Sequence, residues 1–254
     1  MSHRENPIAV QLYTVRAPAS QDFPGTVRKL AAGGAKAVEF AGYGGMEMPA
    51  LQALLKDLGL RVSGSHIPVQ LWETNLQQSL RDLKALGGEY AVVPWVAEDR
   101  RNSLAAARTL AASLDVWGAA ARDAGLGFAY HHHAFEFDPL PDGDGATLFD
   151  ILVQETDPSL VGFEIDVYWA ARGGVDPAHL LRELAGRVPL MHLKDLGPAP
   201  DRKDVPAGMG ELNWADIRAA GRAAGVRWEI VEQDNPNPDD PVADTLLALR
   251  NMEA

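Results

Sequence analysis

Residues 160–195 read LVGFEIDVYWAARGGVDPAHLLRELAGRVPLMHLKD, and they contain the repeating unit from which the fold can be inferred. It opens with the apolar run LVGFEID and closes with a second one, VPLMHLKD, and both are typical of buried β-strands. Between them, Asp176 and Pro177 form an N-cap and first-turn pair that begins the helix AHLLRELAG. A strand, a helix and a second strand in this order predict a βα unit of a parallel sheet.

The same unit recurs along the whole chain. Eight apolar or β-branched runs, each followed by an amphipathic stretch, begin near Ile8, Ala35, Leu60, Glu89, Leu126, Leu160, Val188 and Arg227. Their mean spacing is about 31 residues, which matches a strand, a crossover helix and a return. Eight such units in 254 residues predict a (β/α)8 TIM barrel, an α/β fold, as a single domain over residues 1–254. A doubly wound open sheet has the same alternation and is the alternative.

Capping signals predict where several helices begin and end. The longest helix is expected over Ser103–Asp123, with Gly125 as its stop signal. Pro49 opens MPALQALLKDLG, and Gly59 ends it. Asn213 is the expected N-cap of WADIRAAGRAAG.

Composition excludes several classes of function. The 35 Asp and Glu residues outnumber the 23 Lys and Arg residues, and the formal charge of −12 argues against nucleic acid and anionic membranes as partners. The chain has no cysteine, so any metal must be bound by His, Asp or Glu. Met1–Pro7 is polar and is followed by only a short apolar run, so we expect no signal peptide or membrane span and a cytoplasmic location.

Ionisable residues stand at the carboxyl ends of the predicted strands, where buried parallel strands should be apolar. These residues are Glu39, His66, His131, His132, His133 with Glu136 just beyond, Asp166, His192, Lys194, Asp195 and Glu232. In a barrel the strand ends converge on one mouth, where TIM-barrel active sites are assembled. An open sheet would spread them along an edge, so this pattern favours the barrel.

Side-chain alternation places Asp166, His192 and Glu232 on the inward face of their strands. Two carboxylates and an imidazole suit one divalent metal ion, namely Mn²⁺, Mg²⁺, Co²⁺ or Zn²⁺. A fourth ligand is expected from the fifth strand. Glu136 is the predicted ligand there, and His131, which lies on the strand end itself, is the alternative.

Other strand-end residues have a structural interpretation beside the functional one, because a lone histidine or carboxylate is usually solvated or hydrogen-bonded. Glu39 has two possible roles, a contact to the substrate or an ion pair with Lys36 or Arg61. His132 has the opposite parity to its neighbours and is predicted to be structural. Glu164 is predicted to be a buried, paired carboxylate.

Six short motifs stand in order along the chain: VQLYTVR (10–16), YHHHAFEF (130–137), EIDVYW (164–169), HLKD (192–195), GMGELNW (208–214) and VEQD (231–234). Their order and spacing resemble the sugar phosphate isomerase/epimerase family, the xylose isomerase-like TIM barrels related to inosose dehydratase and tagatose 3-epimerase. The similarity covers nearly the whole chain.

The resemblance implies one divalent metal held by a carboxylate from strand five, Asp from strand six, His from strand seven and Glu from strand eight. Asp166, His192 and Glu232 match this pattern. The chain departs from it at strand five, where His131 stands in place of the epimerases' Glu and Glu136 follows five residues later.

The resemblance also implies a sugar pocket. Gln11, Tyr13 and His66 match polar positions that line it in the family, and Trp95 and Trp169 are expected to supply apolar walls. Trp169 is a second departure, because epimerases have a substrate-binding His at that position.

The implied activity is isomerisation or epimerisation of a sugar or polyol, by proton abstraction next to a carbonyl through a metal-bound enediolate. Glu232 is the expected base, and Glu136 or His131 is the second proton-transfer group. His66 and Lys194 are expected to orient substrate hydroxyls or stabilise charge, although Lys194 can equally form a salt bridge to Asp166 or Glu164.

Two alternative functions stay open. One is a lyase or dehydratase of a keto-sugar, keto-inositol or 3-keto-glycoside, since it shares the proton abstraction. The other is a non-catalytic sugar-binding barrel. In each case the partner is a small sugar or polyol without phosphate, and a homo-oligomer is expected.

Overall fold

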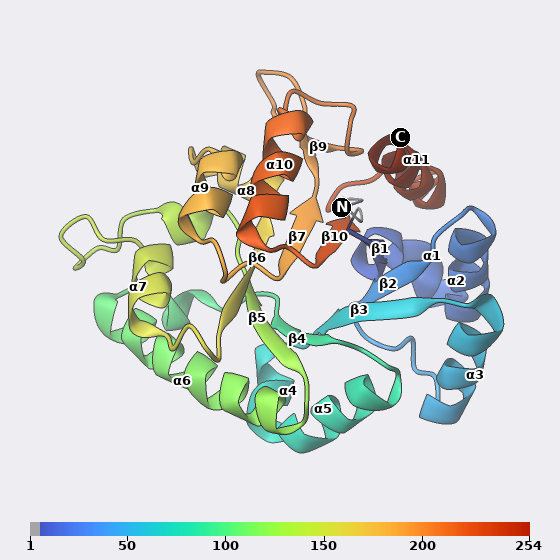
Figure 1. Ribbon diagram of the computed structural model, residues 1–254, viewed down its shortest axis with the longest axis horizontal. Helices are drawn as coiled ribbons and strands as arrows, with labels where there is room; N and C mark the ends of the chain where they lie inside the picture. The colour runs from blue at the N-terminus through green and yellow to red at the C-terminus, as the bar shows by residue number, and fades with distance from the viewer. Residues whose placement is uncertain (1–5) are drawn as a thin grey trace.

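The computed structural model describes residues 6–254, which form a closed parallel barrel with strand order β1-β10-β7-β6-β5-β4-β3-β2 (Figure 1). The strands are β1 (Ile8–Gln11), β2 (Ala37–Phe40), β3 (Arg61–His66), β4 (Tyr90–Val93), β5 (Gly127–His131), β6 (Gly162–Asp166), β7 (Leu190–Leu193) and β10 (Trp228–Val231). Each lies within one of the eight predicted runs, so the predicted TIM barrel is confirmed and the open sheet is wrong. Residues 1–5 of the polar stretch Met1–Pro7 lie outside the described residues.

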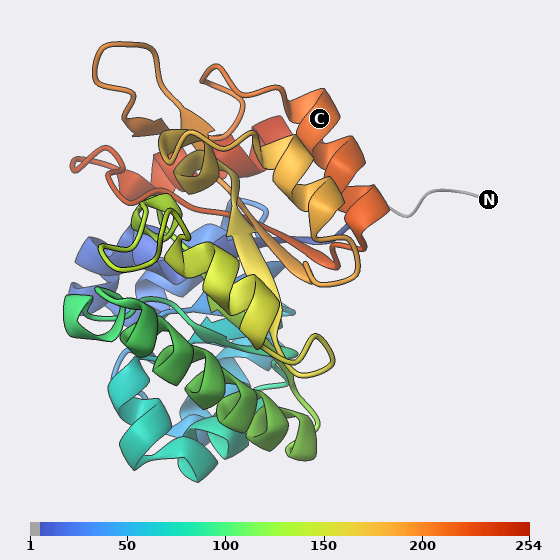
Figure 2. The ribbon, with the colours of Figure 1, turned by 90° about the vertical axis from the view of Figure 1, so that its left-hand side faces the viewer.

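Helices surround the barrel and connect its strands (Figures 1 and 2). The α-helices are α1 (Arg16–Gln21), α2 (Phe23–Ala32), α3 (Met48–Leu58), α4 (Val69–Thr74), α5 (Leu76–Ala85), α6 (Leu104–Asp123), α7 (Leu148–Glu155), α8 (Val167–Arg172), α9 (Pro177–Glu183), α10 (Trp214–Ala224) and α11 (Pro241–Glu253). Three short 3₁₀ turns are η1 (Leu12–Val15), η2 (Glu98–Arg100) and η3 (Phe135–Phe137). In the part of the chain from residue 6 onward, no helix combines the length and the apolar character needed to cross a bilayer.

Most predicted helix boundaries agree with the observed ones, but α9 ends at Glu183 and residues 184–186, the end of the predicted AHLLRELAG helix, form a turn. Ser103, Asp176 and Asn213 each accept a hydrogen bond from the backbone N–H three residues later, as N-caps do. Gly59 has a φ of 64°, the left-handed conformation that ends a helix and favours glycine. These local signals set where the chain leaves each helix and returns to the barrel.

The barrel interior is apolar toward the amino ends of the strands and polar toward their carboxyl ends. The apolar part consists of Ala9, Ala37, Tyr90, Val92, Ala129, Leu190, Trp228 and Ile230. At the boundary, a Cβ on Gly64 would lie 2.6 Å from the Tyr90 carbonyl oxygen and 3.1 Å from Glu39 Oε1, so this position requires glycine. The packed floor leaves the carboxyl-terminal mouth as the place for the ionisable groups.

A short antiparallel strand pair after β7 was not predicted. After β7 the chain forms a short antiparallel pair, β8 (Asp195–Leu196) with β9 (Asp204–Val205). Asp195 anchors the following loop, because its carboxylate accepts hydrogen bonds from the backbone N–H groups of Leu196, Gly208, Gly210 and Leu212 and from Trp214 Nε1. Asp195 is therefore a structural residue rather than part of the site.

Candidate active site

Strand register brings Asp166, His192 and Glu232 together at the mouth of the barrel. Asp166 lies beside His192 in the pairing of β6 with β7, and Ile230 lies beside His192 in the pairing of β7 with β10. Glu232 follows Ile230 by two residues and therefore faces the same way. His192 Nδ1 is 2.7 Å from Glu232 Oε2 and 4.0 Å from Asp166 Oδ2, and all three side chains are buried.

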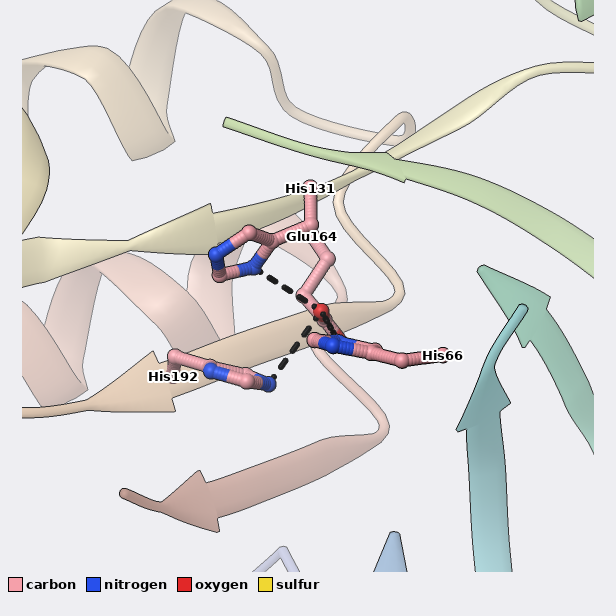
Figure 3. Close-up of side chains that lie close together, drawn as sticks. All are labelled: His66, His131, Glu164 and His192. Carbon is pink, nitrogen blue, oxygen red and sulfur yellow. Dashed lines mark hydrogen bonds and ion pairs between the residues drawn. The ribbon is translucent and has the colours of Figure 1, made fainter. Parts of the chain in front are cut away.

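A second group of possible metal ligands consists of His66, His131, Glu164 and His192, whose side chains point toward one another (Figure 3). Glu164 Oε2 is 2.7 Å from His66 Nε2, 3.0 Å from His131 Nδ1 and 3.2 Å from His192 Nε2. His192 thus belongs to both groups, through Nδ1 in the first and Nε2 in the second. Glu164 is paired and fully buried, as predicted.

Glu39 sits beneath His192 and orients it. Its Oε2 atom accepts a hydrogen bond from Gln11 Nε2 at 2.8 Å and lies 2.8 Å from His192 Nε2. Glu39 pairs with His192 and His66, and Arg61 pairs instead with Glu89. The predicted alternative of an ion pair between Glu39 and Lys36 or Arg61 is therefore wrong. A carboxylate on Nε2 leaves Nδ1 of the same ring directed toward Glu232, which is the usual arrangement behind a metal-binding histidine.

Lys194 is fully buried among three carboxylates. Its Nζ atom lies 2.7 Å from Asp234 Oδ2, 2.8 Å from Glu232 Oε2 and 2.9 Å from Asp166 Oδ2. Burial alone would lower the pKa of Lys194, but these carboxylates raise it well above its usual value. Of the two roles considered for Lys194, the structure shows the salt bridge. Sequence reasoning missed Asp234, although it follows Glu232 at the same parity in VEQD.

The two fifth-strand candidates lie in different surroundings. Glu136 accepts hydrogen bonds from the Tyr130 hydroxyl at 2.9 Å and from the His133 backbone N–H at 2.7 Å, and it lies outside both ligand groups. Burial raises the pKa of Glu136 to about 7. His131 belongs to the second group, with its ring centroid 4.7 Å from that of His192.

His132 has the structural role predicted for it. Its Nε2 atom accepts a hydrogen bond from the Asp166 backbone N–H at 3.2 Å, and its Nδ1 lies 3.0 Å from the His133 carbonyl oxygen. Burial lowers the pKa of His132 to about 4, so the ring is neutral. A neutral ring with Nδ1 as donor satisfies both bonds and holds the end of β6 in place.

The five carboxylates of the site outnumber the basic groups that can balance them, which are Lys194, His192 and His66. Burial raises the pKa of Asp166 to about 6 and that of Glu39 to about 7. Burial alone would lower the pKa of His192, but Glu164 and Glu232 raise it well above its usual value. The Oε1 atoms of Glu39 and Glu164 are buried without a hydrogen-bond partner. Such a site favours added positive charge, and its oxygen and nitrogen donors fit a divalent cation.

A cavity of about 560 Å³ opens above these groups. It is lined by Tyr13, Ala41, Gly42, His66, Pro68, Leu71, Pro94, Trp95, His131, His133, Glu232 and Asp234. Tyr13 and His66, both predicted to bind substrate, are therefore at the cavity. Gln11, Trp169 and Lys194 were also predicted to bind substrate but are not among its lining residues; the Trp169 ring lies 5.7 Å from Lys194 Nζ.

Residues 27–252 match the family model of the xylose isomerase-like TIM barrel. The chain belongs to this family. This xylose isomerase-like barrel superposes on a sugar phosphate isomerase/epimerase from Parabacteroides distasonis with a TM-score of 0.84 and 23% identity, over 98% of both chains. It also superposes on the zinc-bound IOLI protein with a TM-score of 0.71 and 12% identity, over 97% of this chain and 95% of that one.

A curated relative of this xylose isomerase-like barrel is inosose dehydratase from Geobacillus kaustophilus. The two are 36% identical over 75 residues, which cover 30% of this chain and only 23% of the dehydratase. The resemblance to the isomerase and epimerase barrels is confirmed by the family match, and the structural neighbours at these low identities share the fold.

Proposed function

We propose that this xylose isomerase-like barrel is a divalent-metal-dependent isomerase or epimerase of a sugar or polyol. One observation carries the proposal: two carboxylates and an imidazole, from Asp166, His192 and Glu232, meet at the barrel mouth with ligand atoms within 4.8 Å of one another. They lie beneath a cavity that Glu232 itself lines. Ionisable groups at this end of a TIM barrel are typically catalytic.

Asp166, Glu232 and Nδ1 of His192 would hold the ion, while Glu39 fixes the ring through Nε2. From strand five, His131 is the better candidate for a fourth ligand, because both oxygens of Glu136 are engaged, by Tyr130 and His133, whereas only Nδ1 of His131 is engaged, by Glu164. Glu136 also lies outside both ligand groups. When bound, a divalent ion acts as a Lewis acid that polarises a carbonyl oxygen and acidifies the neighbouring C–H bond.

Glu232 is the base in this proposal. Burial alone would raise the pKa of Glu232, but Lys194 and His192 hold it well below its usual value, so the carboxylate is ionised and open to the cavity. His66 and His131 line the same cavity from β3 and β5, which are separated from β10 by two strands on either side of the barrel. They are placed to return a proton or to hold a hydroxyl on another side of the substrate.

A lyase is the second candidate, supported by the local match to inosose dehydratase. Loss of water next to a carbonyl begins with the same proton abstraction. Product mass separates the two reactions, because an isomerase conserves it and a dehydratase lowers it by one water.

The test is proton exchange with solvent. We expect the metal-loaded protein, incubated in D₂O with a panel of ketoses, aldoses and keto-inositols, to label at least one sugar next to its carbonyl, as seen by NMR. Glu232→Gln should slow that exchange by a factor of about 10² to 10⁴, whereas Glu253→Gln on the exposed end of α11 should not. Sugar binding without exchange in the wild type would instead favour a non-catalytic sugar-binding barrel.

A further inference from the structure

An apolar wall forms one sector of the cavity at the barrel mouth. It is made by the segments that follow β2, β3 and β4, which contribute Ala41, Gly42, Pro68, Leu71, Pro94 and Trp95. Because these three strands are neighbours in the barrel, their loops form a continuous surface. The polar groups His131, His133, Glu232 and Asp234 come from the ends of β5 and β10, outside this sector. Within the sector, His66 at the end of β3 is the ionisable lining residue.

The wall exposes large apolar side chains that the rest of the described surface mostly hides. Five large hydrophobic residues are exposed between residues 6 and 254: Tyr13, Leu71, Trp95, Val116 and Met209. Three of them, Tyr13 at 42%, Leu71 at 40% and Trp95 at 49%, line this one cavity. Exposed apolar groups gathered in a concave site indicate a ligand that covers them.

The size and charge of the cavity restrict that ligand. A volume of about 560 Å³ lies in the range that encloses drug-sized molecules and exceeds the needs of one sugar ring. No Lys or Arg occurs among the lining residues, while Glu232 and Asp234 would repel an anion. The additional part of the ligand is therefore neutral and apolar rather than a phosphate.

We propose that the substrate is a glycoside-type molecule. Its sugar binds at the charged mouth of the barrel, and an aromatic or similarly flat apolar group binds against Trp95 and Leu71. The sugar half of this inference rests on the proposed function. A glycosidic bond blocks the anomeric carbon, so the carbonyl needed for proton abstraction is a ketone on the sugar ring. The reaction that supplies such a substrate is the oxidation of a ring hydroxyl of a glycoside.

Paired ligands test the inference by binding rather than by turnover. The metal-loaded protein is titrated calorimetrically with the phenyl and methyl glycosides of each sugar in a panel. We expect the phenyl glycoside to bind at least about tenfold more tightly than its methyl partner. Trp95→Ala should remove most of this preference, so that the phenyl and methyl glycosides of one sugar bind with similar affinities. Val116→Ala on α6 replaces an exposed apolar residue outside the cavity and should change neither affinity.

The outcomes separate this inference from the proposed function. Two results would overturn the apolar-group inference and leave the isomerase proposal intact. One is equal affinity for the phenyl and methyl glycosides in every pair. The other is proton exchange on free sugars by a protein that binds none of the glycosides. A phenyl preference that survives both Trp95→Ala and Leu71→Ala would show that this wall does not hold the apolar group. Absence of both binding and exchange would remove both proposals.

Discussion

At the residue scale, Lys194 provides the only lysine charge within the buried carboxylate cluster of Asp166, Glu232 and Asp234. Replacing it by Met keeps the length of the side chain but leaves these carboxylates without their ammonium partner. We expect Lys194→Met to lower the free energy of unfolding of the metal-free protein by about 3 to 5 kcal/mol. Because Mn²⁺ would supply the missing charge, the loss should be smaller with Mn²⁺ present.

Thermal melts of Lys194→Met with chelator and with Mn²⁺ would measure both effects. Lys203→Met, which removes an exposed lysine 3.7 Å from Asp201, is the control and should be close to wild type. Wild-type stability of Lys194→Met in chelator would contradict the importance given to this ammonium.

Glu136 is expected to make stability depend on pH. Its pKa rises from 4.5 to about 7 on burial in the folded protein. Its contribution to stability is therefore complete below about pH 4.5 and is lost as the pH rises through 7. Glu136→Gln does not titrate and can still bond to Tyr130 and His133, so its stability relative to wild type should increase from pH 5 to pH 8.

Urea unfolding of both proteins at pH 5 and pH 8 gives this comparison. Asp138→Asn, an exposed change in the same loop, provides the baseline. A constant difference between Glu136→Gln and wild type at the two pH values would mean that Glu136 does not gain a proton in this range.

The sequence predicts which residues reach the site better than it predicts their partners. Strand alternation is enough to predict that Asp166, His192 and Glu232 point inward, because the backbone of a strand directs successive side chains to opposite faces. It does not show that Glu39 bonds to His192, since either ring nitrogen can face either carboxylate. It also does not show that Gln11 turns toward Glu39 rather than the cavity. Side-chain torsions and cross-barrel distances decide those contacts.

At the element scale, the loop between β8 and α10 depends on one carboxylate. Asp195 accepts five hydrogen bonds from this loop and its own strand, and a Cβ on Gly210 would lie only 2.4 Å from Asp195 Oδ1. Asp195→Asn would turn an NH₂ group toward N–H donors. We expect it to lower the free energy of unfolding by about 2 to 4 kcal/mol and to make residues 197–213 sensitive to protease.

Limited proteolysis with mass spectrometry would locate the cleavage in Asp195→Asn. Asp201→Asn lies in the same segment on an exposed side chain and should be cleaved like wild type. An unchanged cleavage pattern in Asp195→Asn would show that the loop is held by other contacts.

Elements were predictable where the chain carries a local signal. Ser103, Gly59 and Asn213 mark helix ends because capping is a short-range interaction. The pair β8 and β9 has only two residues in each strand, which is too short for any periodicity. The register shift between β2 and β3 at Val38 and Glu39 also has no counterpart in the local sequence pattern.

At the scale of the whole molecule, the apolar floor of the barrel and its charged mouth are separate layers, so we expect the fold to form without a metal ion. The floor residues Tyr90, Leu190 and Trp228 are buried below the site. Chelation should therefore leave a folded protein that still melts cooperatively. An ion that binds only the folded state adds about 2.7 kcal/mol at a hundredfold excess over its Kd.

For a chain of this size, that free energy corresponds to a rise in Tm on the order of 5 to 10 °C when Mn²⁺ is returned to the chelated protein. Asp166→Asn removes a charge from the proposed ligand group and should abolish most of the rise, whereas Asp138→Asn on the surface should retain it. If Glu164→Gln abolished the rise and Asp166→Asn did not, the ion would belong on the histidine-rich side of His192. Melting temperatures of wild type that are equal with and without Mn²⁺, Mg²⁺, Co²⁺ and Zn²⁺ would contradict metal binding at this mouth, because a site with surplus carboxylate charge must gain stability from a bound cation.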